Sequence, residues 1–268
     1  MISEEVTGLL QEEGIIPHGG GTSILKGGMK RVKGLIDSRR LDLSYFRTAK
    51  GAKGMIEIGA ACTYSEVVER MHEIDQCHIL VKALSQSAST PLRNRISIGG
   101  SVALFPIWSD LMGPLLALEA EVSLIGKNRG RYPIGEYVNK RELRKGMLIT
   151  AVLFKQEAWN AYYYRETRTR VDYPCFTITI LVWEKNNSGN NVIEEIKIVI
   201  IGSAKRFSRL TGLEETLKGQ AINSINIEGI GSALDVEFVG RKGLSAEYIK
   251  ANAGIQLERG LKEVLKIK

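Results

Sequence analysis

Two short segments of this sequence combine glycine with hydroxyl side chains, and both contain residue types that suit phosphate binding. The first is His18-Gly19-Gly20-Gly21-Thr22-Ser23 and the second is Ile98-Gly99-Gly100-Ser101. Glycine reaches positive φ angles and lets backbone N–H groups approach an anion closely, so a glycine-rich turn can cradle phosphate without a lysine. Neither segment matches the G-x-x-x-x-G-K-[ST] or G-x-G-x-x-G fingerprint. The two turns could grip one diphosphate from two sides, or they could be unrelated tight turns.

Composition excludes several classes of protein. The chain has 268 residues, of which 44% are hydrophobic and 25% charged, which is typical of a globular protein and not of a disordered or collagen-like one. Glycine is over-represented: 28 of the 268 residues are glycine, about a tenth of the chain, against a usual share of about 7%. The net charge of +7 is compatible with nucleic acid, a membrane surface, an acidic subunit or a phosphate-bearing ligand. Nine basic residues lie between Lys26 and Lys53, where they form either a solvated face or a docking surface.

Cysteine usage argues against a metal centre in this chain. Cys62, Cys77 and Cys175 are widely spaced, with no C-x-x-C pair, so neither an iron–sulfur cluster nor a structural zinc site is predicted. The sparse cysteines and an acidic N-terminus without an apolar segment predict a soluble protein of the reducing cytoplasm. No apolar run approaches the ~18 residues of a membrane span.

Histidine and serine patterns point to no catalytic group. The three histidines are His18, His72 and His78, and surface positions explain the last two better than a metal site does. No spacing supports Ser/His/Asp nucleophilic catalysis, so no catalytic residue is predicted.

The elements that must position the glycine segments divide into two parts. We predict an N-terminal domain over residues 1–156 and a C-terminal domain over residues 157–268, with the boundary near 154–160. Strands followed by helices in the C-terminal part are typical of an α+β fold. The predicted strands cover 34–37, 55–60, 120–125, 147–154, 158–165, 176–184 and 192–202, and the predicted helices cover 3–13, 63–72, 78–89, 109–118, 204–218 and 245–267. A capping box at 63–66 opens the second of these helices, and residues 127–130 predict a hairpin turn.

The second glycine segment and its surroundings resemble a known family. TPLRNRISIGGS at 90–101, followed by SDL at 109–111 and LLALEAEV at 115–122, is similar to the FAD-binding subunit of molybdenum hydroxylases. This family includes xanthine dehydrogenase and aerobic carbon monoxide dehydrogenase, and its pattern is approximately Q-I-R-N-x-A-T-I-G-G-N. GGGTSIL at 19–25 and IEIGA at 56–60 also resemble family segments in the same order, as do residues 210–219.

The resemblance implies a fold and a function. The fold is a vanillyl-alcohol-oxidase-like FAD-binding domain in two α+β subdomains, followed by a small C-terminal α+β domain. The function is that of an oxidoreductase flavoprotein subunit in a hetero-oligomer, which passes electrons from [2Fe–2S] clusters through FAD to NAD or another acceptor. The implied partners are a molybdopterin-binding large subunit and a [2Fe–2S] small subunit, with no nucleic acid.

The resemblance also implies which residues bind FAD. The two glycine segments would hold the diphosphate, Asp110 would lie near the ribose or the adenine-side phosphates, and Ile149 would pack on the isoalloxazine. Arg168 and Asp172 match an R-x-x-x-D pair at the pyrimidine end, and Tyr164 stands where the family commonly has a basic residue, next to Arg165. His18 is a candidate flavin neighbour or covalent anchor. The full implied set is Gly19, Gly20, Gly21, Thr22, Ser23, Ser97, Ile98, Gly99, Gly100, Ser101, Asp110, Ile149, Tyr164 and Arg168.

Two alternatives remain open from the sequence. Ser101 replaces the family's usual Asn, and the segment 105–108 is bulkier than its counterpart. Together with Tyr164, these differences would suit a cofactor-free homologue that acts as an assembly or regulatory module. Nucleic-acid binding is the other alternative, but only the positive charge favours it, since no helix-turn-helix or aromatic platform is recognisable.

Overall fold

A computed structural model describes residues 4–24, 30–48, 54–187 and 190–267, and the chain in it divides into two compact units. The break at Glu157 lies within one residue of the predicted domain boundary. Two earlier segments, however, belong to the unit that contains the C-terminal part. The first unit comprises Met1–Arg70, Ser89–Phe105 and Leu118–Glu157, and the second comprises Met71–Ala88, Pro106–Ala117 and Ala158–Lys268. Lys26, Lys50 and Lys53 of the basic segment lie outside the described residues.

The first unit is built on a five-stranded antiparallel sheet in the order β3-β4-β7-β5-β6. Its central strand, β7, is buried over nearly its whole length, as expected of a strand with neighbours on both sides. The predicted hairpin at 127–130 is confirmed, because Leu124 pairs with Gly130. The strands are β3 (Phe46–Thr48), β4 (Met55–Gly59), β5 (Glu121–Gly126), β6 (Gly130–Pro133) and β7 (Met147–Lys155).

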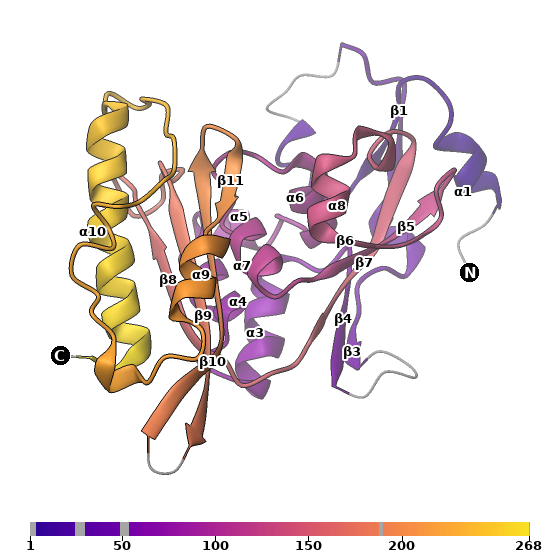
Figure 1. Ribbon diagram of the computed structural model, residues 1–268. Coiled ribbons are helices and arrows are strands. Elements are labelled where there is room, and N and C mark those ends of the chain that lie inside the picture. The colour runs from indigo at the N-terminus through magenta and orange to yellow at the C-terminus, as the bar shows by residue number, and fades with distance from the viewer. Residues whose placement is uncertain (1–3, 25–29, 49–53, 188–189, 268) are drawn as a thin grey trace. The chain divides into compact units, whose positions relative to one another are not determined.

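A separate parallel pair in the first unit carries the first glycine segment. Strands β1 (Ile15–His18) and β2 (Gly34–Asp37) pair in parallel, with His18 opposite Asp37. The glycines therefore leave the sheet directly after β1. Helix α1 (Glu4–Leu9) precedes this pair (Figure 1), and the short 3-10 helix η1 (Ser38–Leu41) follows it.

The remaining helices of the N-terminal half are short, and the first of them has a side-chain cap at its start. Helix α3 (Tyr64–Ile74) opens with the predicted capping box: the Thr63 N–H donates to the Glu66 carboxylate at 2.7 Å, and the Glu66 N–H donates to Thr63 Oγ1 at 3.3 Å. The others are α5 (Thr90–Arg93), α6 (Ile98–Leu104), α8 (Ile134–Asn139) and η2 (Arg141–Leu143) in the first unit, and α4 (Ile79–Leu84) and α7 (Met112–Ala117) in the second.

The second unit contains a four-stranded antiparallel sheet in the order β11-β10-β9-β8. The long C-terminal helix, drawn in yellow in Figure 1, packs against β8 and β9, while α7 packs against β9 and β10. The elements are β8 (Asn160–Arg165), β9 (Thr177–Asn187), β10 (Asn190–Ser203), β11 (Arg206–Arg209), α9 (Thr211–Leu217), η3 (Ile222–Ser224) and α10 (Ala246–Leu265). Mixed helices and antiparallel sheets confirm the predicted α+β class.

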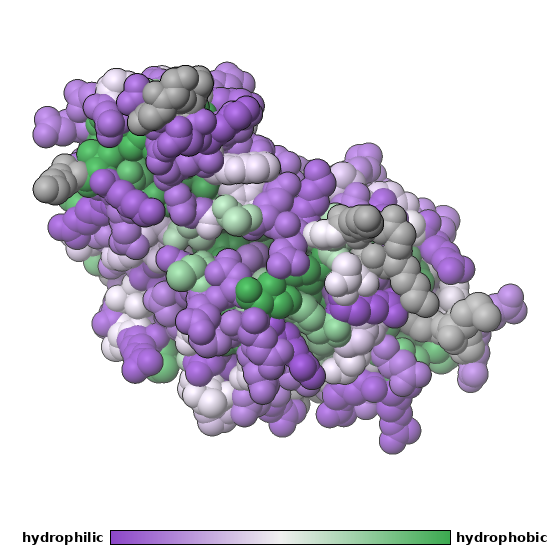
Figure 2. Space-filling view, turned by 90° about the horizontal axis from the view of Figure 1, so that it is seen from below, coloured by the Kyte–Doolittle hydropathy of each residue, from purple (hydrophilic) through white to green (hydrophobic). Residues whose placement is uncertain are grey.

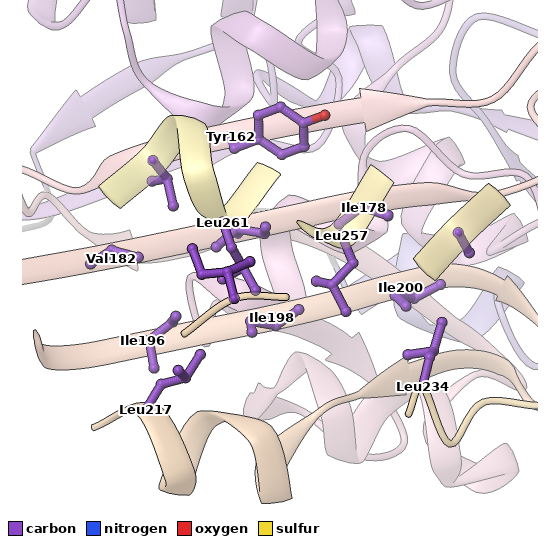
Figure 3. Packing of buried hydrophobic residues seen from close by; sticks show 14 of the residues in the cluster. Tyr162, Ile178, Val182, Ile196, Ile198, Ile200, Leu217, Leu234, Leu257 and Leu261 are labelled. Atoms are coloured by element: carbon purple, nitrogen blue, oxygen red, sulfur yellow. The ribbon is translucent and has the colours of Figure 1, made fainter. Parts of the chain in front are cut away.

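The core of the second unit lies between this sheet and α10. Ile249, Ala253, Leu257 and Leu261 recur every four residues along one face of the helix, and all are completely buried. They meet the alternate residues of β9 and β10, among them Ile178 and Ile198 (Figure 3). Burying each of the isoleucine and leucine side chains contributes about 1.5–3 kcal/mol, so this interface stabilises the unit.

The predicted helix over 204–218 is wrong in its first part. Residues 206–209 form strand β11, which pairs with β10 through a register shift between Ile201 and Ser203. Pairing with an existing sheet edge satisfies the backbone of these residues, and the helix begins only at Thr211. The C-terminal helix predicted over 245–267 is confirmed as α10.

One face of the molecule is mostly hydrophilic, with apolar side chains in scattered patches (Figure 2). None of the helices in the described ranges combines the length and the apolar character that crossing a bilayer requires.

Candidate functional site

The structure brings the two glycine segments together inside the first unit. A Cβ atom added to Gly20 would lie 1.4 Å from the carbonyl oxygen of Arg95, and one added to Gly19 would lie 2.4 Å from Ser97 Oγ. No side chain fits at position 20, where the obstacle is backbone, whereas at position 19 the Ser97 side chain would have to move. Glycine is therefore required at 20 so that the turn after β1 can pack against the backbone of Arg95.

Two further features fix the shape of this turn. The Arg95 side chain donates to the Gly20 carbonyl oxygen through Nε at 3.3 Å and Nη2 at 3.0 Å. Gly21 has a φ of +74°, a backbone conformation that residues other than glycine rarely adopt. The imidazole of His18 lies over Gly21, since its Nε2 would be 2.8 Å from an added Cβ.

The second glycine segment is the start of helix α6, which corrects the prediction of a turn there. Ser97 caps the helix, because its Oγ accepts the Gly100 N–H at 3.3 Å. The N–H groups of Ile98 and Gly99 donate to the carbonyl oxygens of Cys62 and Ala60 at 2.9 and 2.8 Å. Gly99 is needed because a Cβ there would lie 2.7 Å from that of Ala60.

The amides of residues 98–100 thus already have protein acceptors, and that of Ser101 donates within the helix to the Ser97 carbonyl at 3.0 Å. Packing explains the glycine pair at least as directly as anion binding does. The expected contact between residues 97–101 and a diphosphate stays a prediction.

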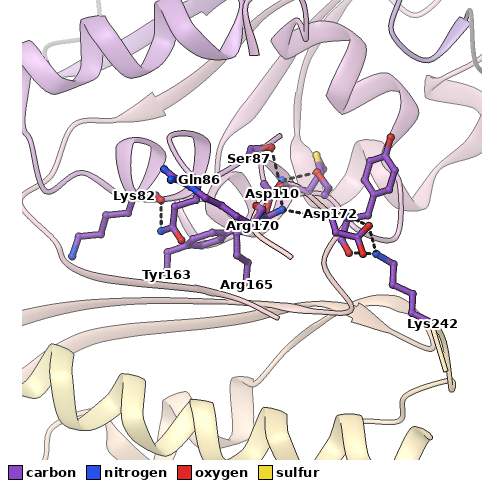
Figure 4. A network of polar contacts seen from close by, with 12 residues as sticks. Lys82, Gln86, Ser87, Asp110, Tyr163, Arg165, Arg170, Asp172 and Lys242 are labelled. Carbon is purple, nitrogen blue, oxygen red and sulfur yellow. Dashed lines mark hydrogen bonds and ion pairs between the residues drawn. The ribbon is translucent and has the colours of Figure 1, made fainter. Parts of the chain in front are cut away.

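A buried polar network in the second unit surrounds Asp110 (Figure 4). Its Oδ1 accepts from Tyr163 at 2.6 Å and from Arg165 Nε at 3.0 Å, and its Oδ2 accepts from Ser87 Oγ at 2.8 Å and from Arg165 Nη2 at 3.3 Å. An ionised carboxylate has about four acceptor sites, and all four are used here. The expected contact of Asp110 with FAD stays a prediction, and the carboxylate has no acceptor site left to offer it.

The same network supports the loop that contains Arg168 and Asp172. Arg165 donates to the backbone oxygens of Arg170 at 2.9 Å and Asp172 at 3.0 Å. Arg165 thus holds the loop from one side while its Nε binds Asp110. Arg168 is exposed, and the ion pair of Asp172 is with Lys242, at 2.9 Å. The Lys242 ammonium and then the Tyr173 N–H lower the pKa of the Asp172 carboxyl.

The three tyrosines of β8 alternate between the faces of the sheet, as a strand requires. Tyr163 faces Asp110, and its pKa is raised well above the usual value by burial and then by the charge of Asp110. Tyr164 packs beside the α10 core, and its hydroxyl donates to Glu166. Burial and then this hydrogen bond raise its pKa. Its expected contact with FAD stays a prediction, as does that of Ile149, which is buried on β7 of the first unit.

Sequence reasoning missed Arg95 as the residue that ties the two glycine segments together, and it treated Arg165 only as a neighbour of Tyr164. A signal for Arg165 was present: it stands two residues after Tyr163, so both share one strand face. No comparable signal marked Arg95, because its contact with Gly20 depends on how the loops pack. Within the described ranges, no group of three His, Cys, Asp or Glu residues could hold a metal ion, and all three cysteines are free.

Comparison with known proteins decides the family. Residues 3–154 match the family described as the FAD-binding domain in molybdopterin dehydrogenase. The chain belongs to this family. It is therefore a flavoprotein component of an oxidoreductase, with FAD as its cofactor. No curated protein sequence matches the chain closely enough to count as a relative.

Solved structures support the fold over nearly the whole chain. The structure of quinoline 2-oxidoreductase from Pseudomonas putida 86 superposes with a TM-score of 0.84 at 16% identity, covering 98% of this chain and 93% of that chain. Carbon monoxide dehydrogenase from Hydrogenophaga pseudoflava gives 0.84 at 23% identity, covering 98% and 94%. Reconstituted CO dehydrogenase from Oligotropha carboxidovorans gives 0.82 at 18% identity, covering 98% and 94%. At these identities the likeness shows the fold.

The turn after β1 fits the diphosphate of FAD. Gly20 lies against the backbone of Arg95, Gly21 has a positive φ, and the Arg95 guanidinium lies against the turn. These are the properties that bind phosphate through backbone N–H groups.

Proposed function

We propose that this flavoprotein is the electron-transfer subunit of a multi-subunit molybdenum hydroxylase of the xanthine dehydrogenase type. It receives electrons from [2Fe–2S] clusters on a small subunit, which in turn takes them from a molybdopterin-binding large subunit, and it delivers them to NAD or another acceptor. The observation that carries the proposal is the family match over residues 3–154.

The cysteines of this chain support the proposal that the iron–sulfur clusters are bound by another subunit. Cys62 and Cys175 are buried and free, and Cys77 is exposed and free. Iron–sulfur clusters need several thiolates at one place, and no such group occurs in the described ranges. In the proposed enzyme the iron–sulfur and molybdenum centres reside on partner chains.

The residues that the resemblance implies would hold the cofactor. The turn of residues 19–23 and the segment 97–101 would bind the diphosphate, while Ile149, Tyr164 and Arg168 would lie toward the flavin. When bound, FAD supplies the centre that accepts electrons from the clusters and passes them on in pairs. Asp110 and Arg165 act inside the protein: their ion pair holds the loop of Arg168 and Asp172 in one conformation.

We further propose a cytoplasmic hetero-oligomer in which the basic segment contacts an acidic partner. Arg31, Lys33 and Arg40 are exposed in this segment, and the only acidic residues between 26 and 53 are Asp37 and Asp42. Arg47 is also exposed, but it is paired with Glu57 at 3.4 Å. Asp37 is already paired with Arg39. The segment therefore presents unbalanced positive charge to a partner.

Purification of the tagged chain from its native cells tests the proposal. We expect co-purification of two further subunits, with iron, molybdenum and FAD in fixed ratio. Addition of the enzyme's reducing substrate should bleach the flavin absorbance, and NAD should restore it. Recovery of the chain without iron or molybdenum would contradict the proposal, and failure of NAD alone would remove only that acceptor.

A further inference from the structure

A single residue, Arg95, contacts Gly20 in two ways. The Arg95 guanidinium donates two N–H groups to the Gly20 oxygen, at 3.3 and 3.0 Å, while the Arg95 carbonyl oxygen lies where a Gly20 side chain would begin. Residues 20 and 95 are far apart in sequence but belong to the same unit. Arg95 therefore acts as a clip across the turn.

Fixing this carbonyl also fixes an N–H group. A trans peptide is planar, so its C=O and its N–H point in opposite directions. The Gly20 oxygen points toward Arg95, and the Gly21 N–H must therefore point away from Arg95. The direction of one donor in the glycine turn is set by a side chain outside it.

Among the described residues, no other hydrogen bond fixes the direction of this peptide. Glycine stands on both sides of the bond, and glycine populates positive and negative φ about equally. Without Arg95 the peptide between Gly20 and Gly21 could rotate and present its oxygen where its N–H now lies. A phosphate would be repelled by that oxygen.

We propose that Arg95 is a positioning residue for the cofactor, which presets the Gly20–Gly21 peptide so that the turn offers an N–H group to the FAD diphosphate. The inference rests on the proposed function in one respect: it takes residues 19–23 as the diphosphate turn. Arg95 acts through the geometry of its guanidinium, whose planar fork reaches one oxygen with two N–H groups; the single ammonium of lysine does not reproduce this.

Three variants of the full chain separate this role from others. R95Q removes the fork and the charge, R95K keeps the charge without the fork, and R93Q is the matched control. Arg93 is two residues away, and its Nη2 donates at 2.9 Å to Thr90 Oγ1. Each flavin-free protein is titrated with FAD by fluorescence at low and high salt, and its melting temperature is measured without FAD.

We expect R95Q and R95K to bind FAD about tenfold more weakly, because affinity falls in proportion to the fraction of the turn in the binding conformation. R93Q should bind as the wild type does. The weakening in R95K should be similar at low and high salt, since a lost geometry and not a lost charge causes it. Melting temperatures of R95Q and R93Q should agree, because Arg95 is exposed.

Two results would overturn the inference. Unchanged affinity in R95Q would show that the clip is dispensable. Normal affinity in R95K, with a salt-sensitive loss in R95Q, would show that Arg95 contacts the diphosphate as a simple charge. A wild-type chain that binds no FAD would instead defeat the proposed function, so the two failures are distinguishable.

Discussion

The guanidinium of Arg165 and the carboxylate of Asp110 form an ion pair inside the second unit, with Nε and Oδ1 3.0 Å apart. The side chains are only 6% and 7% exposed. Asp110 lies just before α7, and Arg165 is the last residue of β8. The pair therefore joins a segment from the middle of the sequence to the C-terminal sheet, and it also anchors the loop of Arg168 and Asp172 through two backbone oxygens.

Removing one partner of this pair should be strongly destabilising. Asp110→Ala leaves the Arg165 charge buried and uncompensated, which costs about 3–5 kcal/mol in the free energy of unfolding. Denaturant titration measures the loss. Asp172→Ala is the matched control, because Asp172 pairs with Lys242 where both side chains are partly exposed, and its effect should be much smaller. Equal effects of the two substitutions would contradict the structural role assigned to Asp110.

Gly20→Ala should prevent the two glycine segments from packing. The added Cβ would lie 1.4 Å from a backbone oxygen, so the turn must move away. We expect a loss of about 1–3 kcal/mol in stability, together with loss of measurable FAD binding. Gly135→Ala is the control: nothing lies within 4 Å of its added Cβ, it is in α8, and alanine there should stabilise by about 0.5–1 kcal/mol. FAD affinity equal in the two variants would refute the packing argument.

His78 should make stability depend on pH. Its Nδ1 accepts the Leu80 N–H at 3.2 Å and so caps α4, and burial lowers its pKa to about 4. In the unfolded chain the pKa of histidine is about 6.5, so the unfolded state binds the proton first as the pH falls. The stabilisation is complete above about pH 6.5 and declines toward pH 4, by about 3 kcal/mol in total.

Denaturation of wild type and His78→Asn at a series of pH values measures this decline. Asparagine is a good helix cap that does not titrate in this range, so the variant should lose less stability between pH 6.5 and 4. His72→Asn, at an exposed position of α3, should follow the wild type. If His78→Asn loses as much stability as the wild type between pH 6.5 and 4, His78 does not control the pH dependence.

Local signals in the sequence predicted much of the fold. The capping box of Thr63 and Glu66, the hairpin at 127–130 and the long helix over 245–267 are encoded by residues close together in the chain. Such features depend on near neighbours, which a single sequence displays. The strand at 206–209 was mistaken for helix because its pairing with β10 is a tertiary contact.

Only part of the candidate site was predictable from the sequence, because only part of it depends on neighbouring residues. Glycine at 19–21 indicated a backbone-lined turn, and the structure places that turn against residues 95–97. The glycines at 99 and 100 suggested a second turn, but the approach of Ala60 and the Ser97 cap make them part of a helix. The hydrogen bonds from Arg95 to Gly20, and those that occupy all acceptor sites of Asp110, join residues that are distant in sequence. No local sequence pattern predicts them.

FAD titration of the purified, flavin-free chain tests the central claim most directly. We predict saturable binding of one FAD per chain, with the absorbance spectrum of a protein-bound flavin and competition by ADP, which shares the diphosphate. A chain that remains folded and assembles with its partner subunits, yet binds no FAD either alone or in the complex, would contradict the account and would identify a cofactor-free assembly module.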